Sequence, residues 1–271
     1  MRKKVAFLVT LVVLVGGGFY LWQNYRGALP VFLGSREDIT EQIPPTGQEQ
    51  LPDAVNNTEF PLTLPKGFSI SILAKNLPGA RDIVQDSFGN LWVSQTSEGK
   101  ITQLEIQNGV VVRANEIFRG LKRPHGLALD GTMLYFAEET KISRVPLYSD
   151  GQIEKLVDLP AGGRHYTRSL KFGSDGLLYV SIGSTCDVCY EKDEKFAAIY
   201  SMQKDGTGFR QVSRGLRNSV FMAVNPVDGK LWATEMGRDN LGNDLPPDEI
   251  NIIEDGKDYG WPVCYGQNVH D

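Results

Sequence analysis

Five polar side chains that could bind an anion stand at matching places in the chain, each just before a short apolar segment. They are Arg81, His125, Arg168, Arg217 and Asn218. Guanidinium groups hold carboxylates and phosphates through paired, charged hydrogen bonds. These residues therefore predict a site for a ligand with several carboxylate or phosphate groups, if the fold brings them together. For any single arginine the alternative is a structural role, with the guanidinium bonded to backbone carbonyls.

His165 is the best candidate for a general base. It follows Gly162, Gly163 and Arg164, which predict a tight turn with a cation next to the imidazole. The cation should lower the pKa of the imidazole and keep the ring neutral. A neutral imidazole in a polar site can remove the proton of a hydroxyl group. The alternative is a histidine that only supports the fold.

A glycine-rich acidic loop, residues 237–249, offers ligands for a metal ion. Its carboxylates and its backbone carbonyls are hard oxygen ligands of the kind that Ca²⁺ prefers. The sequence therefore predicts calcium near this loop.

The elements that must position these residues come from a repeated pattern of a turn residue, a leucine, an aromatic residue and then small or β-branched residues. Its four copies start at Gly89, Gly131, Gly176 and Gly229, at intervals of roughly 40–50 residues. A short apolar segment precedes each copy and another follows it: residues 83–84, 126–129, 170–172 and 221–224, then 101–106, 142–147, 199–202 and 250–253. Each unit of three or four short strands predicts one blade of an all-β propeller. A β-sandwich is the alternative.

In a propeller the first strand of each blade lines the central channel, so the polar residues just before these strands should meet at one rim. A segment at 185–195 that carries two cysteines lengthens the third interval of the repeat. Four blades would leave unpaired edges in a ring of this width, and a new segment begins near Cys264. We therefore expect a C-terminally truncated piece of a larger propeller.

The N-terminal region predicts export. The apolar run at 5–22 follows Arg2, Lys3 and Lys4, which is typical of a membrane anchor, with a cleaved signal peptide as the alternative. Either places the rest of the chain on the extracytoplasmic side of the cell membrane. Residues 23–58 are expected to form a linker and residues 59–271 the propeller. The net charge of -5 and the lack of another basic cluster argue against a nucleic-acid partner.

Three cysteines are too few for a disulfide framework. In an oxidising compartment we expect a local disulfide between Cys186 and Cys189 without a role in chemistry, and a buried, free Cys264. A zinc site would need two further ligands at suitable spacing.

Three stretches resemble the quinoprotein sugar dehydrogenases. They are GGRHYTRSLKFGSDGLLYVSIGS (162–184), RGLRNSVFMAVNPVDGKLWATEMGRD (214–239) and DEINIIEDGKDYGWP (248–262). The CxxC segment, LPPDE (245–249) and WPVCYG (261–266) place the closest similarity in the sorbosone-dehydrogenase-like branch. The resemblance implies a six-bladed β-propeller that binds pyrroloquinoline quinone with Ca²⁺ and oxidises a sugar or a sugar aldehyde. It names no electron acceptor.

The resemblance also implies roles for single positions. His165 matches the general base, and Arg217 and Asn218 match residues that contact the quinone. The main-chain carbonyls of Gly237 and Arg238 match ligands of the cofactor calcium. Glu249 and the carbonyl of Tyr259 match a second, structural calcium site. Two positions depart from the soluble glucose dehydrogenase: Met236 replaces a glutamine that contacts the cofactor, and Arg164 replaces an acid beside the base.

Two other functions remain open at this point. A calcium-dependent, lactonase-like propeller would need metal-binding carboxylates on the inner rim, where the sequence places Asp82 among cations. A catalytically silent propeller could act as an extracellular binding module. Binding of the quinone would separate the first interpretation from both.

Overall fold

A computed structural model describes residues 13–20, 51–242, 244–266 and 269–270. Residues 13–20 form an exposed helix, and no helix in the described part of the chain is long and apolar enough to cross a membrane. The remainder of the predicted anchor, residues 1–12 and 21–22, and most of the predicted linker lie outside the described residues. Export and membrane attachment stay predictions.

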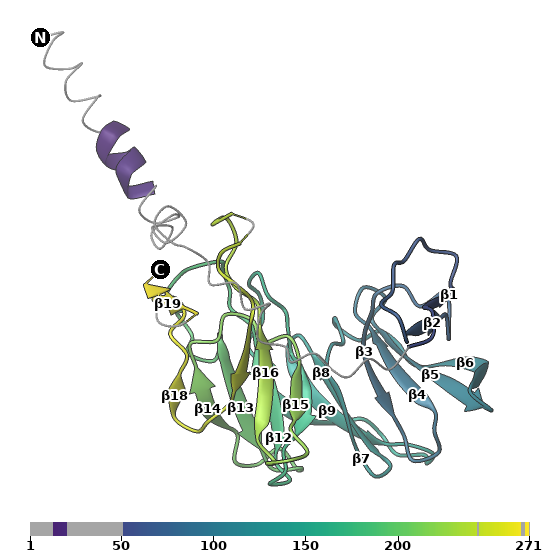
Figure 1. The fold of residues 1–271 in the computed structure, drawn as a ribbon. Coiled ribbons are helices and arrows are strands. Elements are labelled where there is room, and N and C mark those ends of the chain that lie inside the picture. Colours follow the sequence, from purple (N-terminus) through teal and green to yellow (C-terminus); the bar gives the residue numbers. More distant parts are fainter. Residues whose placement is uncertain (1–12, 21–50, 243, 267–268, 271) are drawn as a thin grey trace, which may run out of the picture.

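The described chain forms four antiparallel sheets that stand side by side as blades of a β-propeller (Figure 1). Each sheet is built from strands that are consecutive in the chain, and each predicted repeat forms one blade. The first blade contains β3 (Ala80–Gln85), β4 (Leu91–Gln95), β5 (Lys100–Gln107) and β6 (Val110–Phe118), and the second contains β7 (Leu127–Asp130), β8 (Met133–Glu138), β9 (Lys141–Pro146) and β10 (Glu154–Asp158).

The third and fourth blades carry most of the candidate site. The third contains β11 (Leu170–Phe172), β12 (Leu178–Ile182), β13 (Ala198–Met202) and β14 (Arg210–Arg214), and the fourth contains β15 (Met222–Val224), β16 (Leu231–Glu235) and β17 (Glu249–Ile252). The short strand β18 (Lys257–Asp258) then returns to pair in parallel with β14. This return ties the third blade to the chain that follows the fourth.

Alternation along the second strand of each blade builds the core between blades. Successive side chains of a strand point to opposite faces, so the repeated leucine and aromatic residue point to different neighbours. Buried clusters accordingly combine the aromatic residue of one blade with the leucine of the next: Trp92 with Leu134, Tyr135 with Leu178, and Tyr179 with Leu231. The prediction of a propeller is confirmed. The sandwich alternative is wrong, because the second and third sheets each pack against a different neighbouring sheet on each of their two faces.

Smaller elements lie outside the repeat. Strand β1 (Val55–Asn57) pairs in parallel with β2 (Ser69–Ser71), so the end of the stretch that the sequence assigned to a linker forms a strand. The Asn56 side chain supports this start by donating to the Phe60 carbonyl at 2.8 Å. At the other end, β19 (Cys264–Tyr265) pairs with β20 (Val269–His270). Strands this short have too little periodicity to be found from sequence.

We predict that Leu178→Ala destabilises the fold by about 2–5 kcal/mol, because it leaves a cavity where the second and third blades meet. Leu178 is fully buried in that cluster. Denaturant unfolding provides the measurement. The control is Val227→Ala, at a position that is 91% exposed, where we expect a change within about 0.5 kcal/mol. Equal effects of the two substitutions would contradict this account of the core.

Candidate active site at the ends of the third and fourth blades

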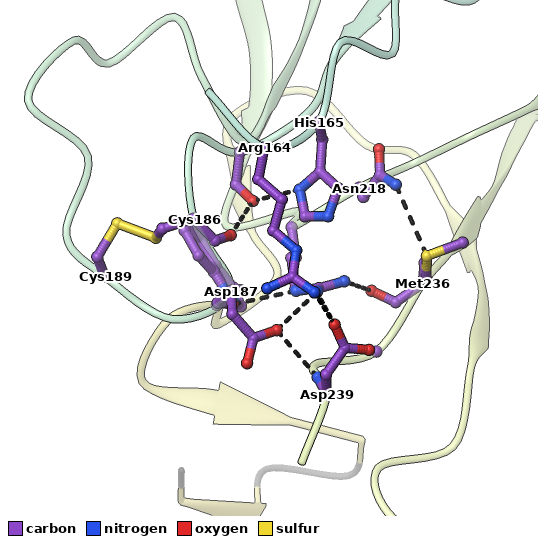
Figure 2. A network of polar contacts seen from close by, with 12 residues as sticks. Arg164, His165, Cys186, Asp187, Cys189, Asn218, Met236 and Asp239 are labelled. Carbon is purple, nitrogen blue, oxygen red and sulfur yellow. Dashed lines mark hydrogen bonds and ion pairs between the residues drawn. A yellow bond between two sulfur atoms is a disulfide. The ribbon is translucent and has the colours of Figure 1, made fainter. Parts of the chain in front are cut away.

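The loop before β11 places His165 beside the end of β12. The His165 backbone N–H donates to the Ser184 carbonyl at 3.1 Å, and its Nδ1 lies 2.8 Å from Ser184 Oγ (Figure 2). Gly183 allows this approach. A Cβ added there would lie 2.6 Å from the His165 Cβ and 2.8 Å from Asn218 Oδ1. Only a glycine therefore permits His165 and Asn218 to come so close to the same stretch of backbone.

The environment keeps the imidazole of His165 neutral. Partial burial, then the charges of Arg217 and Arg164, lower its pKa from 6.5 to about 4. The predicted effect of Arg164 is confirmed in direction, although burial is the larger cause. The resemblance placed Arg164 where relatives have an acid beside the base. The side chain bonded to the imidazole is instead that of Ser184, while Arg164 forms an ion pair with Asp239.

Arg217 is buried and held by two acidic residues that the sequence analysis missed. Its Nε donates to the Asp187 carbonyl at 3.0 Å, its Nη2 to Asp187 Oδ1 at 2.7 Å, and its Nη1 to the Met236 carbonyl at 3.1 Å. Asp187 Oδ1 also accepts from the backbone N–H of Asp239 at 2.9 Å. Two arginines therefore face two carboxylates, and this part of the predicted cationic funnel is electrically balanced.

Asn218 is buried and offers an unfilled acceptor. Its Oδ1 has no hydrogen-bond partner among the described residues, and its Nδ2 contacts only the Met236 sulfur, at 3.8 Å. The backbone is fixed by Glu235, which accepts from the Asn218 N–H and from the Ser219 hydroxyl, each at 2.8 Å. Burial raises the pKa of Glu235 to about 7. A buried, unsatisfied amide oxygen is costly in a closed core, so this acceptor calls for a donor, either a water molecule or a ligand.

Arg81 and His125 form a second polar pair, from the first and second blades. Arg81 Nε donates to His125 Nε2 at 2.8 Å, and Arg81 also lies over the ring of Phe221 at 5.8 Å. Because Arg81 is the donor, His125 must be neutral at Nε2. Burial, with the nearby charges of Arg81 and Arg168, lowers the pKa of His125 to about 3. Arg81 itself forms no ion pair with any described residue.

Arg168 is a structural brace. Its guanidinium is fully buried and donates to three backbone carbonyls, those of Glu139, Thr167 and Pro160, at 2.6–3.1 Å. The carbonyl-binding alternative left open for the arginines therefore describes this residue, and Arg168 is left out of the cofactor site proposed below.

The predicted metal ligands surround one small cavity. Gly237, Arg238, Glu249 and Tyr259 all line a space of about 20 Å³, together with Glu235, which is paired with Glu249 across β16 and β17. Such a volume accommodates a single water molecule or ion. Glu249 accepts from the Gly266 N–H at 2.6 Å and from Asn251 Nδ2 at 3.1 Å. The residues that the resemblance assigns to two calcium sites thus line one cavity, which has room for a single ion.

Asp82 does not provide the inner-rim carboxylate that a lactonase-like site needs. Its two oxygens accept from the backbone N–H groups of Ile83 and Leu127, each at 2.8 Å. It therefore joins the first blade to the second.

The cysteines largely follow expectation. Cys186 and Cys189 form a disulfide, which confirms the local pairing, and Cys264 is free. Cys264 is half-buried and not buried, because it lies on the short edge strand β19.

A family model described as TrAA12-like matches residues 62–269. The chain belongs to the TrAA12-like family. The resemblance to quinoprotein sugar dehydrogenases is therefore confirmed at the level of family and fold, while the sorbosone-like branch stays a prediction.

Two relatives and a solved structure describe what the chain is similar to. A pyrroloquinoline quinone-dependent sugar dehydrogenase of Hypocrea jecorina is 27% identical over 73% of this chain and 56% of that protein. A protein of Borreliella burgdorferi is 28% identical over 76% of this chain and 58% of its own length. The PQQ-bound aldose sugar dehydrogenase of Streptomyces coelicolor has a TM-score of 0.60 at 25% identity, over 74% of this chain and 69% of that one.

The chain spans little more than half the length of the Borreliella and Hypocrea proteins. A Trichoderma reesei structure of carbohydrate-active enzyme family AA12, with a TM-score of 0.64 at 23% identity, supports the fold alone. The six-blade count and the truncation stay predictions.

We predict that the free energy of unfolding falls as the pH drops from 6.5 towards 3, because of His125. Over this range the unfolded chain binds a proton at the imidazole that the folded chain excludes. A shift from 6.5 to about 3 corresponds to a loss on the order of 5 kcal/mol once the pH is below both values.

Denaturant unfolding between pH 7 and 4 measures this slope. His125→Gln should make the slope shallower, since the glutamine has no proton to gain, and part of the slope that remains comes from His165, whose pKa is lowered to about 4. An unchanged slope in a variant that still folds would show that the acid sensitivity arises elsewhere.

Proposed function

We propose that this protein is a quinoprotein dehydrogenase that oxidises a hydroxyl group of a sugar or a hydrated sugar aldehyde, with pyrroloquinoline quinone and Ca²⁺ as cofactors. The observation that carries the proposal is a neutral, half-buried imidazole at His165 next to the unfilled carboxamide of Asn218, both packed on Gly183. The family and the printed names of the Hypocrea and Streptomyces relatives support the choice of cofactor and of substrate class.

The residues present fit a quinone that carries three carboxylates. Asn218 Oδ1 is buried without a described partner, so a donor on the ligand would satisfy it. Arg81 is exposed, has no acidic partner among the described residues, and can bind a carboxylate directly. Arg217 already donates from all three of its nitrogens, so it contributes positive charge more than free donors.

The quinone would supply a two-electron acceptor for the hydride of the substrate carbon, and Ca²⁺ would polarise it. His165 would take the hydroxyl proton at Nε2, the ring nitrogen that has no hydrogen bond with a described residue. The pKa of about 4 keeps the ring neutral at pH 7. Bound carboxylates would raise this pKa, because nearby negative charge favours the imidazolium, so the base would become stronger once the site is filled.

We predict that His165→Ala mainly lowers the rate of turnover, whereas Arg81→Gln mainly lowers the affinity for the quinone. His165→Ala should lower the rate of dye-linked aldose oxidation by about 100- to 10,000-fold at saturating quinone, because it removes the base. Its affinity for the quinone should stay close to that of the parent. Arg81→Gln should weaken quinone binding first, because it removes a cation from the rim. Quinone titration and steady-state kinetics measure both.

The matched control is Arg119→Gln, which should leave binding unchanged. Arg119 is exposed, and its ion-pair partner among the described residues is Glu116. Turnover of His165→Ala within tenfold of the parent would refute the assignment of the base. If the full chain with Ca²⁺ binds no quinone, the proposed function fails and the binding-module interpretation replaces it.

We further predict that Ca²⁺ stabilises the fold through Glu249 and the Tyr259 carbonyl. Both residues line the small cavity beside Glu235. A ligand that binds only the native state raises the melting temperature with its concentration. Glu249→Gln should reduce this rise, while Glu254→Gln, an exposed residue paired with Lys257, should not. Thermal melts with calcium and with a chelator test the site, and identical curves would exclude it.

A further inference from the structure

The disulfide loop, residues 184–189, touches both the candidate base and the buried arginine. Figure 2 shows the Asp187 carboxylate facing the cluster of Arg164 and Asp239, while the Cys186 side chain turns away toward Cys189. The loop contributes a hydroxyl at Ser184, a carbonyl at Cys186, and both a carbonyl and a carboxylate at Asp187. The disulfide joins Cys186 to Cys189, so Asp187 lies inside the closed ring and Ser184 lies just before it.

The hydrogen bonds of Ser184 determine which nitrogen of His165 carries the proton. A serine hydroxyl has one hydrogen to donate. Ser184 Oγ donates it to the Cys186 carbonyl at 2.7 Å. Its contact with His165 Nδ1 at 2.8 Å must then be one that it accepts, so the proton of the neutral ring is on Nδ1. Nε2 keeps its lone pair.

Asp187 fixes the other end of the same loop. Its carbonyl accepts from Arg217 Nε at 3.0 Å and from Trp261 Nε1 at 3.1 Å, and its carboxylate accepts from Arg217 Nη2 at 2.7 Å. The Thr185 N–H and hydroxyl both donate to Glu191, each at 2.7 Å. The Cys186 carbonyl thus lies between anchored neighbours, and the bond to Cys189 removes the remaining freedom of this short segment.

We propose that the disulfide loop is a positioning element that selects the tautomer of His165. The Cys186 carbonyl, acting through Ser184, holds the imidazole with its proton on Nδ1 and leaves Nε2 as the proton acceptor. Opening the disulfide removes this selection. The use of Nε2 in catalysis rests on the proposed function. The choice of tautomer does not, since it follows from contacts within the chain.

The ring nitrogens of His165 report the tautomer directly in an ¹⁵N NMR experiment on the full chain without cofactor. The chain has only three histidines, and His165→Gln identifies the signal. At pH 7 in the oxidised protein we expect one neutral form with the proton on Nδ1. Ser184→Ala should give a mixture of tautomers. So should reduction with a phosphine, or the double substitution Cys186→Ser and Cys189→Ser.

Two controls separate positioning from loss of structure. Ser181→Ala removes a buried hydroxyl from β12 that has no partner among the described residues, and it should leave the His165 tautomer unchanged. His125 is held with its own proton on Nδ1 by Arg81, so its signal should not move in any variant that stays folded. A shift of both histidines would indicate general unfolding and would count against a local effect.

The outcomes are distinct. A proton on Nε2 of His165 in the oxidised protein overturns the proposal. A single Nδ1 tautomer that persists after both thiols are free overturns the role of the disulfide. If the quinone binds, Ser184→Ala should lower kcat about tenfold, a part of what a general base supplies, with quinone affinity unchanged. The expected tautomers without any quinone binding would reject the proposed function and leave the positioning role intact.

Discussion

The fold depends on the alternation of side chains along the second strand of each blade. A leucine on one face and an aromatic residue on the other allow each sheet to fill the gap left by its neighbour. Burial of such pairs contributes about 1.5–3 kcal/mol for each large side chain. Because this apolar core lies between the sheets, the loops at the blade ends are left to carry polar residues.

In the candidate site these loops bring charged groups into a half-buried space. Arg217 and Arg164 would repel each other and any imidazolium, so the structure matches them with Asp187 and Asp239. Breaking a buried pair of this kind costs several kcal/mol, because it leaves an uncompensated charge. Because the two aspartates balance the two arginines, cations can lower the pKa of the His165 imidazole without giving the whole site a large positive charge.

The blades could be predicted from the sequence, because they depend on local signals: the apolar segment at 170–172, for example, coincides with β11. The glycines before His165 predict a tight turn, where the structure has a bend at Gly163 and Arg164, and the role of His165 as a base stays a prediction. Arg168, Asp187 and Asp239 could not be assigned in this way. Their partners lie far away in the chain, and nothing in the residue types separates an arginine that binds carbonyls from one that binds a ligand. Ser184 is the last residue of the stretch 162–184 that resembles the sugar dehydrogenases. Its contact with His165 depends, however, on the hydrogen bond that it donates to the Cys186 carbonyl.

The alternation of leucine and aromatic residue also gives the arc of blades a direction. The first blade presents Ile83, Val93 and Leu104 around an apolar hollow of about 470 Å³, and the fourth presents Trp232, Met222 and Val224 around one of similar size. Each end is thus the counterpart of the other, as in a heterologous, head-to-tail contact. Such a contact closes into a ring when the rotation between units divides a full turn, and grows into an open filament when it does not. In both arrangements the two apolar hollows are removed from water.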